Sequence, residues 1–138
     1  MSRYPDYYYN QSAVIPVRGS GQELRILLIT SRSGKRWVIP KGIIEPDLSP
    51  AESAAKEAME EAGIAGEVRP EPIGRYQYDK WGGTCEARVF VMRVDEVREQ
   101  WLESFRKRGW FTLEEALRRV QEDDLKKIMR RLPEFLSA

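Results

Sequence analysis

The stretch that decides the fold is GIIEPDLSPAESAAKEAMEEAGI, residues 42–64, in which a glycine-bearing loop runs into a helix. Ser49 is a good N-cap residue, and Glu52 three positions later completes the S-x-x-E pattern of a capping box. Gly63 supplies a C-terminal stop, because glycine readily takes the left-handed conformation that ends many helices. These signals predict a helix over about Pro50–Ala62.

Three glutamates of this helix, Glu57, Glu60 and Glu61, are spaced i, i+3 and i+4, which puts them on one helical face. Like charges at these spacings repel one another by about a few tenths of a kcal/mol per pair. A divalent cation reverses that sign, and Mg²⁺ is typically bound by a few carboxylates together with waters and substrate phosphates. The other interpretation is a solvated acidic face, which the i,i+4 partners of Lys56 favour.

The loop before the helix favours the metal-binding interpretation. Helix N-termini attract anions, and Gly42 allows the backbone to approach a ligand closely. Lys41 adds a positive charge that attracts phosphate. Metal-binding glutamates beside such a loop suit the hydrolysis of a diphosphate, since the metal neutralises phosphate oxygens and lowers the pKa of the attacking water. A further carboxylate then accepts the proton of that water.

The segment resembles the Nudix box, G-x5-E-x7-R-E-U-x-E-E-x-G-U, in which U is a bulky aliphatic residue. The match is in register over residues 42–64, at Gly42, Glu57, Glu60, Glu61, Gly63 and Ile64. The resemblance implies an α+β fold, namely a Nudix-type α/β/α sandwich with a mixed β-sheet, in a single domain over residues 1–138. It also implies a dependence on Mg²⁺, with Mn²⁺ as an alternative, and hydrolysis of a diphosphate bond.

Carried over residue by residue, the resemblance makes Glu57 and Glu61 metal ligands, with the backbone at Gly42 as a further ligand. Glu60 is the expected catalytic base or an additional metal ligand. A downstream carboxylate often assists in the family, and three residues of this chain qualify equally at this point: Glu86, Glu99 and Glu103.

Two positions depart from the box. Leu48 stands where the first glutamate is expected, and Lys56 stands where arginine is expected. A lysine facing a leucine avoids both a lone carboxylate and an unpaired guanidinium, so the two changes can compensate for each other. The alternative is a Nudix-fold binding module that has lost turnover, which the complete glutamate set opposes.

Basic residues flank Trp37 and recur before Trp110, in two short clusters on expected loops. Arginine contacts phosphate through two hydrogen bonds, and lysine binds it as a point charge. The expected substrate-binding residues are Arg32, Arg36, Lys41 and Arg106. The alternative is that these runs are ordinary solvated loops.

Residues 101–111, WLESFRKRGWF, and the Ser31-Arg32 pair are similar to the diphosphoinositol-polyphosphate and diadenosine-polyphosphate hydrolase subgroup of the family. That subgroup carries a basic tract where this chain has Tyr7-Tyr8-Tyr9-Asn10-Gln11. The smaller charge favours a dinucleoside polyphosphate or another nucleoside diphosphate derivative over a densely phosphorylated inositol. The tyrosines either stack on a nucleobase or pack the N-terminal arm over the sheet. ADP-ribose, a nucleotide sugar and an RNA 5′ end are alternative substrates.

The rest of the chain alternates between strand and helix signals. Pro16 places the first strand at a sheet edge or a bulge. The prediction has strands over 12–17, 24–29, 37–39, 67–78 and 84–94, an apolar piece at 110–111, a turn at 80–83 and a loop over 41–48. Helices are predicted over 113–121 and from 123 to about 132, before Pro133.

Composition narrows the class of protein. The 138 residues fit one domain, and 23 basic against 22 acidic side chains leave a net charge of +1, so a general attraction for nucleic acid is excluded. The absence of histidine excludes Ser-His-Asp and Cys-His catalysis, and the single Cys85 excludes intramolecular disulfides. No apolar run approaches the roughly 20 residues of a membrane span. The N-terminus also lacks the apolar region of a signal peptide, so we expect a cytoplasmic enzyme acting on a small phosphorylated molecule.

Overall fold

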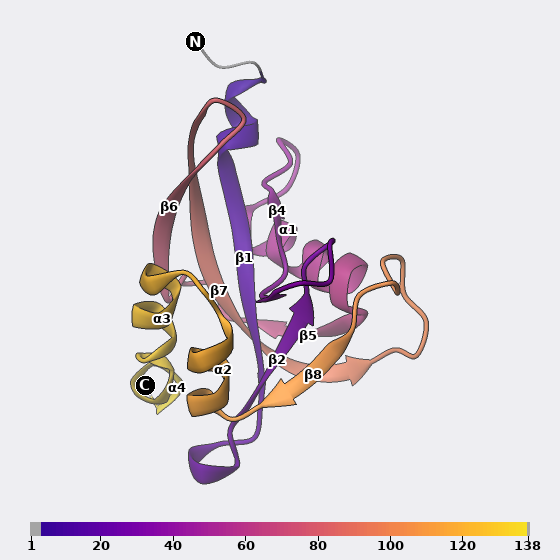
Figure 1. Ribbon diagram of the computed structural model, residues 1–138, viewed down its shortest axis with the longest axis vertical. Coiled ribbons are helices and arrows are strands. Elements are labelled where there is room, and N and C mark those ends of the chain that lie inside the picture. The colour runs from indigo at the N-terminus through magenta and orange to yellow at the C-terminus, as the bar shows by residue number, and fades with distance from the viewer. Residues whose placement is uncertain (1–3, 138) are drawn as a thin grey trace.

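The computed structural model describes residues 4–137, which form a mixed eight-stranded sheet with helices on both faces. The strands, in chain order, are β1 Asn10–Arg18, β2 Arg25–Thr30, β3 Trp37–Val38, β4 Lys41–Ile43, β5 Ile64–Val68, β6 Gly74–Lys80, β7 Gly83–Val97 and β8 Arg108–Phe111. The α-helices are α1 Pro50–Glu57, α2 Leu113–Arg119, α3 Asp123–Met129 and α4 Leu132–Ser137. Figure 1 shows α1 on one side of the sheet and α2 to α4 on the other.

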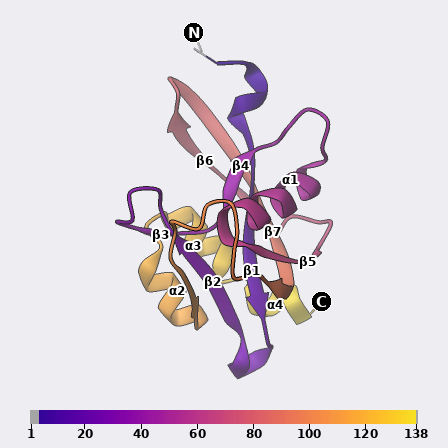
Figure 2. The ribbon, with the colours of Figure 1, turned by 90° about the vertical axis from the view of Figure 1, so that its right-hand side faces the viewer.

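The central strands are buried on both faces, and their side chains alternate between two cores. Ala13, Ile15 and Val17 of β1 point into the core under α2, α3 and α4, whereas Val14 points into the core under α1. The same alternation runs through β2 and β7. On the α1 side the small residues Ala54, Ala58 and Ala62 allow the helix to lie close to the sheet. Figure 2 looks onto the α1 side, with α1 in front of the sheet and α3 behind it, and this layering confirms the expected α/β/α sandwich.

The helix of the decisive stretch begins and ends where its signals predict, but its last turn is different. Ser49 accepts a hydrogen bond from Glu52 N–H and Glu52 accepts one from Ser49 N–H, so the capping box is complete. After Glu57 the chain widens into a π turn over Ala58–Ala62, and Gly63 ends it at φ 66°. Such π turns are rare and recur at functional sites.

Pro16 does not mark a sheet edge, and that prediction is wrong. β1 is the middle strand, parallel to β7 on one side and antiparallel to β2 and β4 on the other. β4 pairs with residues 11–13 and β2 with residues 17–18, so Pro16 lies in the gap between these two partners. The missing N–H of proline therefore breaks no ladder with either strand.

Three further predicted elements need correction. The predicted loop at 41–48 begins with β4, which adds to β1 through residues 41–43. The predicted strand at 67–78 is two strands, β5 and β6, because the prolines at 70 and 72 remove ladder donors between them. The predicted last helix corresponds to α3, and a further helix that was not predicted, α4, begins at Leu132, since Pro133 fits the first turn of a new helix.

The expected turn at 80–83 is confirmed as a tight hairpin between β6 and β7. Trp81 and Gly82 occupy its two central positions with φ 56° and 72°. Two positive φ angles define the hairpin turn whose twist matches the flanking strands. The N-terminal arm continues from a short turn over Asp6–Tyr9 into β1, whereas Met1–Arg3 of the arm lie outside the described residues. Within residues 4–137, no helix combines the length and apolar character that crossing a membrane requires.

Candidate active site

Gly42 and Glu57 make the tightest contact of the site. A Cβ atom placed on Gly42 would lie 2.3 Å from Glu57 Cδ and 2.4 Å from Glu57 Oε1, so any side chain here would displace the Glu57 carboxylate. The glycine is therefore required by close approach, since its φ is not in the left-handed region. The carboxylate of Glu57 lies directly against the backbone of β4.

Glu61 lies beside Glu57 and is nearly enclosed, with 9% of its surface exposed. Its Oε1 accepts a hydrogen bond from the backbone N–H of Lys41 at 3.2 Å. Burial, with the neighbouring Glu57 carboxylate, raises the pKa of Glu61 to about 8 despite that hydrogen bond. Burial also raises the pKa of Glu57. At neutral pH without a cation the pair therefore retains a proton, because a buried carboxylate and a half-buried one side by side cannot both ionise cheaply.

Glu60 is not among the residues that line the cleft in front of this pair. The π turn explains the placement, because it contains more residues per turn than an α-helix. Glu57 and Glu61, which are four positions apart, are therefore separated by nearly one full turn and share a face. Glu60 is only three positions after Glu57, so it lies off that face. Glu60 remains close enough to raise the pKa of Glu57 by its negative charge.

The loop between β7 and β8 brings Glu103 into the cleft, which is also lined by Glu45, Glu57 and Glu61. Its backbone N–H donates to Glu60 O at 2.9 Å, and Trp101 Nε1 donates to Glu61 O at 3.0 Å. Arg108 donates to Ala62 O at 3.0 Å. The free carbonyls at the end of the helix thus dock the loop, as helix ends require partners.

The structure separates the three downstream carboxylates that the sequence left open. Glu103 lines the same cleft as Glu57 and Glu61. Glu86 instead lies 3.5 Å from Arg75 and lines a different hollow. Glu99 is exposed and lines no part of the cleft.

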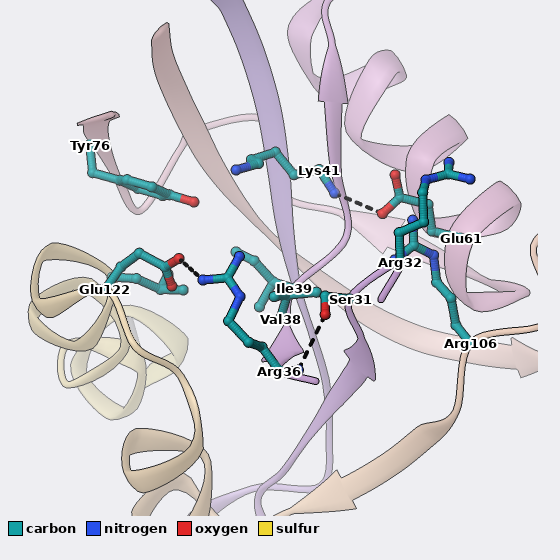
Figure 3. Close-up of a pocket in the computed structure, with 11 residues that line it drawn as sticks. Ser31, Arg32, Arg36, Val38, Ile39, Lys41, Glu61, Tyr76, Arg106 and Glu122 are labelled. Atoms are coloured by element: carbon teal, nitrogen blue, oxygen red, sulfur yellow. Dashed lines mark hydrogen bonds and ion pairs between the residues drawn. The ribbon is translucent and has the colours of Figure 1, made fainter. Parts of the chain in front are cut away.

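The four predicted substrate-binding residues gather around one pocket beside Glu61 (Figure 3), but their surroundings differ. Arg32 is 75% exposed at the mouth and lies 3.6 Å from Glu103. Arg36 is held by Gln121 and Glu122 at 3.2 and 3.4 Å.

The remaining two are more enclosed. Arg106 is 9% exposed, binds Thr30 O at 3.0 Å and donates twice to Glu103, so its observed contacts orient that carboxylate. Lys41 points its ammonium away from Glu61 and over the Tyr78 ring at 3.9 Å, in a place where burial lowers its pKa.

Comparison with known proteins decides the family. A model of the NUDIX domain matches residues 9–132. The chain belongs to the Nudix family. It is therefore a Nudix pyrophosphohydrolase, an enzyme that hydrolyses acid anhydrides, and the expected Nudix sandwich is confirmed.

Relatives and solved structures agree with this membership. The chain is 30% identical over 120 residues to the cow protein "Diphosphoinositol polyphosphate phosphohydrolase 3-beta", covering 85% of this chain and 72% of the relative. It is 36% identical to "Nudix hydrolase 21, chloroplastic" of Arabidopsis thaliana, covering 88% of this chain and 65% of the relative. Its fold matches a crystal structure of a C. elegans Ap4A hydrolase with a TM-score of 0.79 at 20% identity, over 94% of this chain and 98% of that one.

The Nudix residues fit a hard divalent cation. Glu57 and Glu61 present carboxylate oxygens at one point of the cleft, and burial together with the neighbouring Glu57 charge raises the pKa of Glu61. Among residues 4–137 no group of three or more acidic, histidine or cysteine side chains is preassembled for a metal. Two protein carboxylates suit Mg²⁺, which keeps several waters and takes substrate phosphates as its other ligands.

Glu45, which was not among the predicted site residues, explains the two departures from the Nudix box. Lys56 Nζ donates to both carboxylate oxygens of Glu45, at 2.7 and 2.8 Å. Glu45 lies three positions before Leu48, and its N–H donates to Ser53 Oγ at 3.3 Å. The predicted compensation, a lysine facing a leucine, is thus replaced by an ion pair whose carboxylate comes from elsewhere in the same loop. The acidic residues of this loop are the sequence signal that points to Glu45 as the partner of Lys56.

Proposed function

We propose that this Nudix hydrolase uses Mg²⁺ to cleave a diphosphate bridge in a dinucleoside polyphosphate or a related nucleoside diphosphate derivative. The observation that carries the proposal is the Glu57–Glu61 pair, with Glu103 on the same open cleft of about 460 Å³. A cation is needed to offset the repulsion between these carboxylates. An anionic substrate needs the same cation, because the carboxylates would otherwise repel it.

In this mechanism the protein's own groups hold the metal and orient its ligands. Glu57 and Glu61 hold the metal, with the backbone at Gly42 beside them, and Lys41 N–H fixes the orientation of Glu61. Bound Mg²⁺ supplies neutralisation of the phosphate oxygens and a more acidic attacking water. Arg32 and Lys41 provide positive charge on the wall of the cleft for the phosphate oxygens.

The proton of the attacking water goes to a glutamate, and we propose Glu60 for this role from its place in the Nudix box. Glu103 is the competing residue, because it lines the cleft directly. The variants Glu60→Gln and Glu103→Gln separate the two. The one that removes the acidic limb of the pH–rate profile marks the base, whereas loss of rate with an unchanged profile marks a supporting role.

The charge of the cleft supports a substrate with few phosphates. The basic residues that line the main cleft are Arg32, Lys41 and Lys80, and Arg32 is itself 3.6 Å from Glu103. Arg36 and Arg106 line the adjoining pocket, where carboxylates of the protein engage both. A diphosphoinositol polyphosphate, named for the cow relative, carries many more phosphates than three cations neutralise. A dinucleoside tetraphosphate, named for the C. elegans structure, is a closer match in charge.

The test is release of products from a substrate panel in Mg²⁺ buffer. The panel contains diadenosine polyphosphates, ADP-ribose, nucleoside triphosphates, 5′-triphosphorylated RNA and a diphosphoinositol polyphosphate, with chelator and Glu57→Gln as negative controls. Glu114→Gln, a change on the exposed face of α2, is the matched control. Preferred cleavage of the diadenosine compounds supports the proposal. Preference for any other member overturns the substrate class, and turnover that survives chelation overturns the metal dependence.

A further inference from the structure

Five aromatic residues gather where the N-terminal turn meets the tip of the β6–β7 hairpin. The rings of Tyr4 and Tyr8 stack with centroids 5.4 Å apart, and Tyr7 packs edge-on to Tyr8 at 5.1 Å. Trp81 contacts the cluster from the hairpin, with its ring 5.5 Å from Tyr8. Tyr9 donates its hydroxyl hydrogen to Trp81 O at 2.7 Å, so the arm is tied to the hairpin.

Trp81 occupies an uncommon position for a bulky residue. Its φ of 56° lies in the left-handed region, where glycine and asparagine are the usual choices for this turn. Within residues 4–137 it is the one residue other than glycine with a positive φ. Strain of this kind persists where the surroundings hold the residue in place, and it recurs at binding sites. The arm tyrosines provide those surroundings.

The aromatic cluster and the carboxylates belong to one cleft. Tyr7, Tyr8 and Trp81 line it together with Glu57 and Glu61. Tyr7 is 40% exposed, so aromatic surface is open to a ligand. Lys80 adds positive charge to this wall, with its ammonium 4.5 Å from the Trp81 ring.

We propose that Tyr7, Tyr8 and Trp81 form the subsite that receives a nucleobase of the substrate, with Lys80 close to its phosphate chain. This inference rests on the proposed function, because it assumes that the substrate phosphates bind beside the cation held by Glu57 and Glu61. A nucleoside attached to those phosphates and extending along the cleft would meet the aromatic cluster. A planar base stacks on aromatic rings, whereas an inositol ring has no π-face to offer them. The subsite therefore selects nucleotides over phosphorylated inositols.

Binding by calorimetry in Mg²⁺ buffer tests the subsite without turnover. The first probe is a diadenosine polyphosphate analogue with methylene bridges, and the second is methylenediphosphonate, which has phosphorus groups and no base. The variants are Tyr8→Ala and Trp81→Gly; the glycine suits the positive φ of the turn. Each variant is expected to weaken the nucleotide analogue by about 5- to 100-fold, the usual effect of removing a stacking ring, and to leave methylenediphosphonate within about twofold. Tyr8→Phe keeps the ring and is expected to bind as the unmodified protein does.

Each other outcome overturns a distinct claim. Equal weakening of both probes in both variants shows that the cluster only supports the cleft, and unchanged nucleotide binding shows that it does not touch the base. If the unmodified protein binds neither probe, the proposed function itself fails. Melting temperatures show whether the two variants remain folded. Quenching of tryptophan fluorescence by the nucleotide gives a second readout, and it is expected to be lost in Trp81→Gly.

Discussion

At the scale of single residues, the candidate site depends on how closely the backbone of β4 approaches the helix that carries Glu57 and Glu61. Gly42 touches the Glu57 carboxylate, and Lys41 N–H binds Glu61. One short segment thus positions both carboxylates of the expected metal site. Neither contact depends on a charged side chain of the segment, so a substitution of Gly42 acts through geometry.

Gly42→Ala is expected to lower kcat/KM by about a hundredfold, because the added methyl group displaces Glu57 and a misplacement of about 1 Å costs that much. Calorimetric titration with Mg²⁺ should show weaker binding as well. Gly21→Asn is the matched control, since Gly21 has open space around it and a φ that asparagine tolerates. An activity of Gly42→Ala equal to that of the control would disprove the positioning role.

The Glu45–Lys56 pair gives a second prediction at this scale. Glu45→Gln is expected to lower kcat/KM by about tenfold through loss of support for the neighbouring Glu57, with little change in melting temperature, because both partners are 41% exposed. Adding Leu48→Glu should restore activity by returning a carboxylate to the box position. Failure of this rescue would mean that Glu45 acts in some other way than by pairing with Lys56.

At the scale of elements, the π turn and the β7–β8 loop form one unit. The turn aligns Glu57 with Glu61, and its carbonyl groups receive the loop that carries Glu103. Gly63 makes the junction possible: a Cβ atom there would lie 2.7 Å from Trp101 Cβ, and its φ of 66° suits glycine. The loop and the helix end therefore move together.

Trp101→Phe removes the indole donor to Glu61 O while keeping an aromatic ring. The loss of one hydrogen bond predicts a decrease of about 1 kcal/mol in the free energy of unfolding. A fall in kcat is also expected, because Glu103 is then less firmly placed. Urea unfolding and steady-state kinetics measure the two effects. Leu102→Ala changes a neighbour that is 76% exposed and should alter neither, so equal effects from both variants would contradict the docking argument.

At the scale of the whole molecule, the enclosed carboxylate pair couples stability to pH and metal. A raised pKa means that folded Glu61 retains a proton between its ordinary value of 4.5 and about 8, whereas the unfolded chain loses it. The unfolding free energy contributed by this group therefore falls as pH rises through that window. A metal that binds the ionised pair reverses the loss.

Without divalent metal, the melting temperature is expected to fall between about pH 5 and pH 8, and Glu61→Gln should reduce that slope. Mg²⁺ should raise the melting temperature more at pH 8 than at pH 5. Differential scanning calorimetry with chelator or with Mg²⁺ makes the comparison, with Glu114→Gln as control. A slope that persists unchanged in Glu61→Gln would place the titrating group elsewhere.

Local patterns in the sequence predicted most of the elements and the residues of the expected metal site. The capping box and Gly63 fixed both ends of the helix, alternation predicted the buried strands, and the box spacing identified Glu57 and Glu61. These features depend on neighbours within a few residues, whose preferences are written in the chain itself.

The tertiary structure decided which distant residues meet. It selected Glu103 among three carboxylates, paired Lys56 with Glu45, and brought the arm tyrosines to Trp81, 72 positions away from Tyr9. It also placed Pro16 inside the sheet and turned Glu60 from the cleft. These contacts depend on the path of the chain through the sheet and on which donors reach the carbonyl groups at the helix end. Neither is encoded in a local sequence pattern.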